Sequence, residues 1–314
     1  MKVTILGCGV YGLALANSFL SKDFVKVTMW SKFQDEVDYL SKKYFHILFS
    51  TDMESATKGA DLVVIAIPVA FLEETMKSYC KVYHGEDILI ASKGIELQRQ
   101  YFAYEIIQNY LKQAPIGVIS GGTFAQDMTE KKVMGLTLGT DCIRIRDKVK
   151  KSLESSFLKI QYSDDILGVS VCGAIKNVMA IGFGMLDGAN YPPSSRFLFL
   201  TEAIYEIRKL ISLLGGNPDT IMSYAGIDDI MMTCTSSQSR NYTLGKLIGE
   251  KSNSQKIEEY KQNTTVEGLG TSKAIFKLAE KKNITLPISS IIYKILYEDY
   301  DVSDLIYLLE EHNT

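Results

Sequence analysis

The stretch that decides the fold is KVTILGCGVYG, residues 2–12. Its apolar start is typical of a buried β-strand, and GCGVYG then fits G-x-G-x-x-G directly after that strand. In this motif Gly7 permits the tight turn, Gly9 lets a pyrophosphate approach the backbone, and Gly12 allows close packing of helix on strand. The N–H groups at the start of the helix then face the phosphates. We therefore predict a dinucleotide-binding βαβ unit at the start of the chain.

The alternation of short β-rich runs with helical stretches continues to about residue 163. Several of the predicted strands are continuous apolar runs, which is typical of strands covered on both faces. The predicted strands are 2–6, 25–30, 61–67, 87–92, 116–120 and 135–139, with helical stretches such as 69–80 and 101–112 between them. This alternation predicts an α/β domain over residues 1–163, a Rossmann-like, doubly wound and mainly parallel sheet.

Beyond residue 163 the pattern becomes helical, with little β signal. Ser163 is placed to cap a long helix that starts near Asp164, because a serine side chain can accept a hydrogen bond from the first free N–H groups. The predicted helices are 165–187, 195–213, 240–249, 266–281, 287–298 and 302–311. We therefore expect an all-α substrate and catalytic domain over residues 164–314.

Composition narrows the class of protein. The chain has 314 residues, 46% of them hydrophobic and 23% charged, with a net charge of −3. This balance gives no reason to expect nucleic acid or an anionic membrane as a partner. No uninterrupted apolar stretch approaches the roughly 18 residues of a membrane span, so we expect no stable membrane insertion.

The five cysteines are scattered, odd in number and never in a CxxC pair. This pattern argues against a disulfide framework and against a zinc site, so we predict no metal and a cytoplasmic location. The glycines in the first 12 residues interrupt the apolar run that a secretion signal would need.

The nucleotide type depends on the end of the second predicted strand. NAD-binding proteins usually carry an acidic residue there, which binds the ribose 2′-OH. This chain has Trp30, Ser31 and Lys32 at that place. Without a carboxylate, and with a cation at hand, either NAD or NADP is expected, with NADP slightly favoured. The alternative is that Lys32 is an ordinary solvated lysine at a helix start.

Further stretches combine glycines with polar side chains. Lys93 follows a predicted strand at the sheet edge where doubly wound folds bind ligands. Lys176 lies inside the otherwise small and apolar run CGAIKNVMAIG, residues 172–182, and an unpartnered buried ammonium is costly. The other stretches are SGGTFAQDM (120–128), AGIDDIMMTCTSSQSRN (225–241) and TTVEGLGT (265–272). Taken singly, each fits a helix cap or a surface charge equally well.

The order of these elements resembles that of the NAD(P)-dependent glycerol-3-phosphate dehydrogenases, bacterial type. The matching elements span nearly the whole chain: GCGVYG (7–12), SKG (92–94), GGTFA (121–125), GAIKN (173–177), DDIMMTC (228–234), SRN (239–241) and VEG (266–268). The resemblance implies hydride transfer between a nicotinamide and dihydroxyacetone phosphate, which gives sn-glycerol 3-phosphate. It implies a small phosphorylated substrate, and we expect a homodimer.

The resemblance also implies roles for individual residues. It makes Lys176 the general acid and base, with Asp229 and Lys93 as further catalytic residues. The implied cofactor-binding residues are Gly7, Gly9, Val10, Tyr11, Gly12, Lys93, Ala125, Arg240 and Glu267. The implied substrate-binding residues are Lys93, Gly121, Thr123, Lys176, Asn177, Asp229, Thr233, Ser239, Arg240 and Asn241.

Four positions depart from the family's pattern. Gly122 stands where the family usually has proline, Asp228 where it has glycine, Ser194 where it has asparagine, and Glu202 where it has arginine. A charge reversal near a site for an anionic substrate leaves two other readings open. One is a dehydrogenase of the β-hydroxyacid type that acts on another small anion. The other is a sensor protein that binds NAD(P) and has lost turnover.

Overall fold

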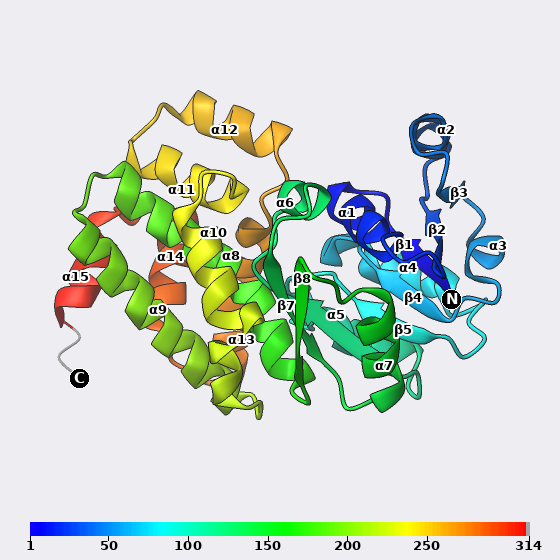
Figure 1. Cartoon of the computed structure of the whole chain (residues 1–314). Coiled ribbons are helices and arrows are strands. Elements are labelled where there is room, and N and C mark those ends of the chain that lie inside the picture. The colour runs from blue at the N-terminus through cyan, green and yellow to red at the C-terminus, as the bar shows by residue number, and fades with distance from the viewer. Residues whose placement is uncertain (312–314) are drawn as a thin grey trace. The chain divides into compact units, whose positions relative to one another are not determined.

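The computed structural model describes residues 1–311, which fall into two compact units (Figure 1). The first unit comprises Met1–Lys93 and Ala103–Ile166, and the second comprises Gly94–Phe102 and the chain from Leu167 onward. The sequence assigned residues 94–102 to the first domain, whereas the structure groups them with the second. Within the second unit, Lys281 Nζ lies 3.4 Å from both Arg99 O and Gln100 Oε1, and these contacts hold the segment there.

An eight-stranded sheet forms the centre of the first unit, in the order β3-β2-β1-β4-β5-β6-β7-β8. Every neighbouring pair is parallel except β6 and β7, so the predicted doubly wound, mainly parallel sheet is confirmed. The strands are β1 Lys2–Leu6, β2 Lys26–Trp30, β3 Leu48–Ser50, β4 Leu62–Ile65, β5 Asp87–Ile90, β6 Ile116–Ser120, β7 Met134–Gly139 and β8 Leu158–Ser163. The strand order reverses beside β1, and ligands bind at such a switch point.

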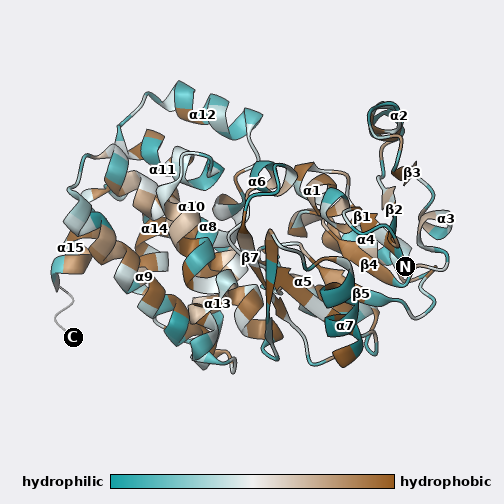
Figure 2. Cartoon of the chain, viewed as in Figure 1, coloured by the Kyte–Doolittle hydropathy of each residue, from teal (hydrophilic) through white to brown (hydrophobic). Residues whose placement is uncertain are grey.

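Helices connect these strands. They are α1 Val10–Phe19, α2 Gln34–Lys43, α3 Met53–Thr57, α4 Val69–Tyr79, α5 Ala103–Tyr110, α6 Ala125–Thr129 and α7 Ile143–Ser152. Strands β4, β5 and β6 are buried along their whole length, whereas α2 and α7 are mostly hydrophilic (Figure 2). The core therefore lies on the sheet, and the helices present their polar faces to water.

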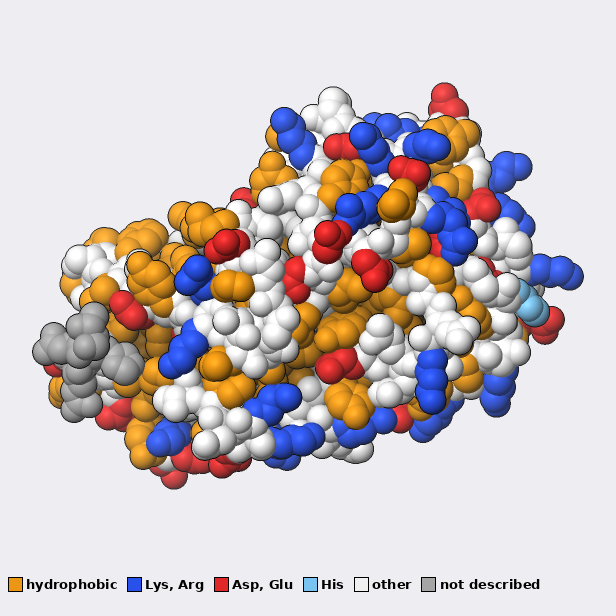
Figure 3. All heavy atoms as spheres, turned by 90° about the horizontal axis from the view of Figure 1, so that it is seen from below, with side chains coloured by type: hydrophobic (Ala, Val, Ile, Leu, Met, Phe, Trp, Pro, Cys, Tyr) orange, Lys and Arg blue, Asp and Glu red, His pale blue; other side chains and the backbone are white. Residues whose placement is uncertain are grey.

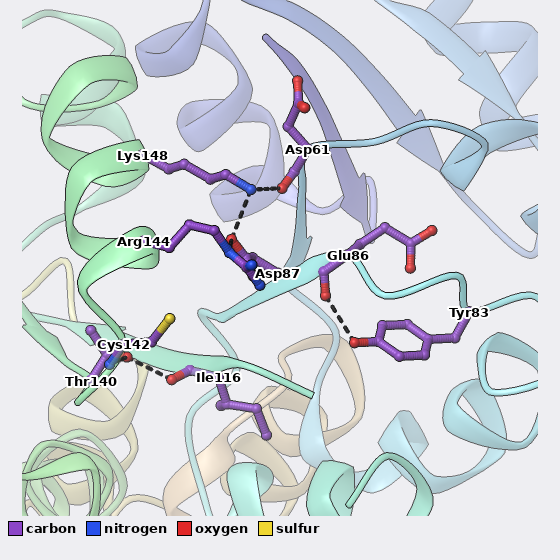
Figure 4. A network of polar contacts seen from close by, with 9 residues as sticks. All are labelled: Asp61, Tyr83, Glu86, Asp87, Ile116, Thr140, Cys142, Arg144 and Lys148. Atoms are coloured by element: carbon purple, nitrogen blue, oxygen red, sulfur yellow. Dashed lines mark hydrogen bonds and ion pairs between the residues drawn. The ribbon is translucent and has the colours of Figure 1, made fainter. Parts of the chain in front are cut away.

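A network of polar contacts fixes α7 to the start of β5 (Figure 4). The fully buried Asp87 carboxylate accepts hydrogen bonds from Arg144 Nε, at 2.8 Å, and forms an ion pair with Lys148 Nζ, at 2.7 Å. Lys148 Nζ also donates to Asp61 O, at 2.6 Å. Burial alone would raise the pKa of the Asp87 carboxyl, but the hydrogen bonds from Arg144 and Lys148 outweigh it, and the pKa is lowered.

The second unit is built from helices, as predicted. They are α8 Ile166–Gly188, α9 Pro193–Leu213, the 3-10 helix η1 Pro218–Met222, the π-helix η2 Tyr224–Asp228, α10 Asp229–Thr235, α11 Arg240–Gly249, α12 Ser254–Asn263, α13 Glu267–Lys282, α14 Pro287–Tyr297 and α15 Ser303–Glu311. Helix α8 starts one residue after the predicted 165, and the Ser163 hydroxyl accepts a hydrogen bond from Asp165 N at 3.1 Å.

Helix α8 is the apolar axis of this unit. Its 23 residues are long and apolar enough to cross a membrane by length and composition, with a mean hydropathy of 1.7 in its most apolar window. However, 89% of that window is buried inside the protein. This is the pattern of the core helix of a folded domain.

Helices α8 and α11 pack with their backbones in contact. A Cβ atom built on Gly184 would lie 2.2 Å from Tyr242 O, and one built on Gly245 would lie 2.0 Å from Ile181 O. The four glycines of this contact, which we call the glycine seam, are Gly184, Gly188, Gly245 and Gly249. Each pair is four residues apart, so both glycines of a helix lie on the same face.

The surface carries charges of both signs. On the face shown in Figure 3, Lys and Arg side chains are interspersed with Asp and Glu side chains. All five cysteines are free, and Cys8, Cys172 and Cys234 are buried. Within residues 1–311, no three His, Cys, Asp or Glu side chains come together as metal ligands would.

Candidate functional site

The glycine turn between β1 and α1 has the form that a dinucleotide needs. Gly7 has a φ of +114°, and a Cβ there would lie 2.5 Å from Ala66 O. A Cβ on Gly12 would lie 2.4 Å from Gly7 O, whereas nothing lies within 4 Å of a Cβ built on Gly9. Val10, the first residue of α1, is 76% exposed. The space above Gly9 and the start of α1 therefore suit a pyrophosphate.

Buried hydroxyls lie in the same unit. The hydroxyls of Tyr11, Ser120 and Thr123 are buried and have no hydrogen-bond partner among residues 1–311. Lys93 Nζ lies 3.5 Å from Gly121 O and 5.8 Å from the centre of the Tyr11 ring. A buried hydroxyl without a partner typically costs about 1–3 kcal/mol. Such groups are completed by an ordered water or by a polar ligand. The sequence did not single out Ser120, because a serine at the end of an apolar strand carries no distinctive signal.

The loop between β6 and α6 is tightly built. A Cβ on Gly121 would lie 2.4 Å from Gly135 O, so a larger residue does not fit there. Thr123 N donates to Gly121 O at 2.9 Å, and this bond closes a three-residue turn around Gly122. Gly122 stands where the family usually has proline, and this turn fixes the backbone around it. Ala125 then begins α6.

In the second unit, α8 and α10 bring Lys176, Asp229 and Thr233 together. Lys176 is 7% exposed and Asp229 is fully buried. Lys176 Nζ donates to Asp229 Oδ1 and, at 3.2 Å, to Thr233 Oγ1, which itself lies 3.2 Å from Asp229 Oδ1. Asp229 and Thr233 are four residues apart and so share one face of α10. The lysine that interrupts the apolar run is thus buried and ion-paired.

A second chain of hydrogen bonds joins α8, α11 and α13. Asn177 Nδ2 donates to Glu267 Oε2 at 3.2 Å, and Asn241 Nδ2 donates to Asn177 Oδ1 at 2.9 Å. Asn241 Oδ1 accepts from Gly268 N, also at 2.9 Å. A Cβ on Gly268 would lie 2.7 Å from Asn177 O, so the glycine of the VEG element allows this approach. The structure therefore brings Asn177, Asn241 and Glu267 into one network.

The start of α11 carries the SRN element. Ser239 is the N-cap, and its hydroxyl accepts from Tyr242 N at 3.3 Å. Arg240 is exposed at the first helical position. The guanidinium and the partial positive charge of the helix start together favour an anion.

Of the four positions that depart from the family, Gly122 is buried, whereas the other three are at least partly exposed. Asp228 is exposed, whereas its neighbour Asp229 is buried. Ser194 is exposed near the start of α9, and Glu202 is partly exposed on the same helix. Cys234, beside the buried lysine cluster, has a raised thiol pKa, mainly because of burial. It is therefore an unreactive thiol.

Two carboxylates lie at the end of β2, where the sequence shows none. Lys32 Nζ lies 2.6 Å from Glu74 Oε1 of α4, and both side chains are exposed. The buried Ser31 donates its hydroxyl proton to Glu36 Oε2 in the first turn of α2. The cation that favoured NADP is therefore ion-paired, and an acidic group reaches the strand end from the following helix.

Comparison with known families gives matches along most of the chain. The family model described as the N-terminus of NAD-dependent glycerol-3-phosphate dehydrogenase matches residues 2–145, and the corresponding C-terminus model matches residues 165–307. A glycerol-3-phosphate dehydrogenase of Staphylococcus aureus, named as acting with NAD(P)+, is 31% identical over 99% of this chain and 98% of its own length.

Solved structures show the same fold. The crystal structure of glycerol-3-phosphate dehydrogenase from Coxiella burnetii has a TM-score of 0.92 and 26% identity, and covers 99% of this chain and 98% of that one. The Plasmodium falciparum glycerol-3-phosphate dehydrogenase structure has a TM-score of 0.87 at 20% identity, over 100% of this chain and 96% of that one. The latter likeness concerns the fold alone.

Proposed function

The chain belongs to the family of NAD-dependent glycerol-3-phosphate dehydrogenases, and from this premise we propose that it interconverts sn-glycerol 3-phosphate and dihydroxyacetone phosphate. It is an oxidoreductase that uses NAD or NADP and takes a small phosphorylated substrate. The observation that supports the proposed chemistry best is the buried contact of Lys176 with Asp229 and Thr233. A buried lysine with two polar partners is a common arrangement for acid–base catalysis.

The glycine turn of residues 7–12 would hold the dinucleotide, whose nicotinamide would supply or accept the hydride. Reduction turns the C2 carbonyl oxygen of the substrate into an alkoxide, which needs a proton and a nearby positive charge. In our proposal Lys176 provides both, acting as general acid in reduction and as general base in oxidation. Asp229 and Thr233 accept hydrogen bonds from Lys176 Nζ and so orient it.

The remaining site residues are proposed to bind the substrate and the cofactor. Arg240 offers a planar fork of donors to the substrate or cofactor phosphate, and its place at a helix start adds to that attraction. The buried Thr123 hydroxyl, which has no hydrogen-bond partner among residues 1–311, and the Lys93 ammonium would bind substrate and nicotinamide. Asn177 and Asn241 hold substrate, while Glu267 orients the Asn177 amide and contacts the cofactor. Residues 1–163 are in this view the cofactor domain and residues 164–314 the catalytic domain.

The direct test follows NADH or NADPH oxidation with dihydroxyacetone phosphate, and with 3-oxo acids in parallel. We expect turnover with dihydroxyacetone phosphate, and a loss of about 10²–10⁴-fold in kcat for Lys176→Ala. Turnover with 3-oxo acids alone would favour the β-hydroxyacid type of dehydrogenase. Cofactor binding without turnover on either substrate would favour a sensor. Activity within a few-fold of wild type in Lys176→Ala would refute the role of the lysine.

We further propose a homodimer that works in the cytoplasm. Support for the dimer comes from α9, which exposes Phe197, Leu198, Tyr205 and Leu213 between 48% and 61% of their surface. Support for the location comes from the five free cysteines, since reducing compartments keep thiols free. Light scattering of Leu198→Asp against wild type tests the dimer, which the variant should dissociate.

A further inference from the structure

The end of β2 carries an acidic group that its own sequence lacks. Ser31 is 4% exposed and donates its hydroxyl proton to Glu36 Oε2, which leaves Glu36 Oε1 without a hydrogen-bond partner within the described chain. Phe33 N donates to the same serine oxygen at 3.2 Å. Gln34 and Asp35, in the same helical turn, are exposed. Only Glu36 of this turn is thus folded back onto the strand end.

Glu36 also lies close to the glycine turn. Gly7 N donates to Trp30 O at 2.9 Å, so the turn and the end of β2 are direct neighbours. Burial raises the pKa of the Cys8 thiol to about 12, and the Glu36 carboxylate adds to that rise. Because the Glu36 carboxylate affects the pKa of Cys8, it lies near the middle of the glycine turn. The carboxylate is therefore next to the place where the adenosine ribose follows the pyrophosphate.

The lysine at the strand end does not offset this charge. Lys32 is held at 2.6 Å by Glu74, and that contact lowers the pKa of the Glu74 carboxyl. Two carboxylates, Glu36 and Glu74, therefore stand against one ammonium at the end of β2. The ion pair between Lys32 and Glu74 is exposed and weak, so its effect on the preference between NAD and NADP is smaller than that of Glu36.

We propose that Glu36 is the specificity-determining residue for the dinucleotide, accepting the hydrogen bond of the adenosine ribose 2′-OH and disfavouring a 2′-phosphate. The chain then prefers NAD(H) over NADP(H), the reverse of the preference that Lys32 alone suggested. This inference rests on the proposed function, because it requires a dinucleotide at the glycine turn.

The expected size of the effect follows from the type of bond. A hydrogen bond to a charged group is typically worth about 10- to 100-fold in affinity, and a like charge on the ligand adds repulsion. Because Glu36 is only partly buried, we expect NADH to bind at least about tenfold more tightly than NADPH.

Trp30 provides a readout that is independent of turnover. It is the single tryptophan of the chain and the last residue of β2, next to Ser31. Its fluorescence on titration with NADH and NADPH, checked by calorimetry with 2′,5′-ADP and 5′-ADP, gives dissociation constants without substrate. Glu36→Gln should shrink the NADH-to-NADPH affinity ratio at least about tenfold. Asp35→Asn removes the same charge from the same turn without touching Ser31, and should leave the ratio unchanged.

A second variant tests the lysine. Glu74→Gln releases Lys32, so NADPH affinity should rise a few-fold while NADH affinity stays constant. The inference is overturned if wild type binds NADPH as tightly as NADH, or if Glu36→Gln and Asp35→Asn shift the ratio equally. Binding with the expected ratio but no turnover with dihydroxyacetone phosphate would overturn the proposed function alone. Binding of neither dinucleotide would overturn both.

Discussion

Replacing Gly184 by alanine tests whether the glycine seam sets the geometry of the second unit. The new Cβ would lie 2.2 Å from Tyr242 O, whereas ordinary contacts begin at 3.4 Å. Helices α8 and α11 would therefore have to separate locally by about 1 Å, and backbone cannot yield as a side chain does. Alanine gains about 1 kcal/mol of helix propensity, but overpacking costs about 1–3 kcal/mol and more against backbone. We expect a net loss of about 2 kcal/mol.

For a unit of this size, about 2 kcal/mol corresponds to a fall of roughly 4–8 °C in Tm, measured by circular dichroism. Gly270→Ala is the matched control, because Gly270 is an exposed residue of α13 with nothing within 4 Å of an added Cβ. It should raise Tm by roughly 2 °C through propensity alone. Because α8 carries Lys176 and α11 carries Asn241, Gly184→Ala should also lower kcat/KM. A Gly184→Ala protein as stable as wild type would refute the reasoning.

Two further predictions concern charged side chains. Arg240→Lys should raise the KM for dihydroxyacetone phosphate about tenfold with Tm unchanged, because an ammonium cannot form the bidentate contact. An unchanged KM would show that Arg240 is only a surface cation. Asp87→Asn should lower the free energy of unfolding at pH 7 by about 2 kcal/mol, below the usual cost of a broken buried pair since Arg144 is 59% exposed. The native pKa of Asp87 is lowered, so its contribution is present above the unfolded value and is lost as pH falls through the native one. The difference in free energy of unfolding between variant and wild type, measured by urea unfolding, should therefore shrink as the pH falls. A difference that stays constant down to pH 2 would contradict this.

Local sequence patterns predicted most of the fold. The run from Lys2 to Gly12 predicted the first strand, turn and helix, and the helical periods after residue 163 predicted the second unit. Strand β3 was missed because three residues at a sheet edge leave no periodic pattern. Strand β8 was missed because its alternation, buried at Leu158 and Ile160 but exposed between them, lies directly against the helical run. Helix α12 buries no residue and so has no apolar stripe to detect.

The candidate site was predictable only in part. The resemblance implied that Asp229 is catalytic and that Asp229 and Thr233 bind substrate. In the structure both side chains accept hydrogen bonds from Lys176 Nζ. Glu36 was not named, since an acidic residue in the first turn of a helix ordinarily interacts with the helix dipole. Only the backbone path from Ser31 into α2 turns that side chain back to the strand. The orientation of the Glu36 side chain depends on tertiary structure, which the local sequence pattern does not show.

The buried position of Cys8 has a consequence for oxidative damage. This cysteine lies inside the glycine turn, where any adduct on its sulfur would disturb the loop. With a pKa raised to about 12, the thiol stays protonated at pH 7. Because the thiolate is the form that peroxides and alkylating agents attack, the turn carries its sulfur in a nearly inert state. The carboxylate of Glu36, which contributes to this pKa, thereby also helps to protect the loop from oxidation.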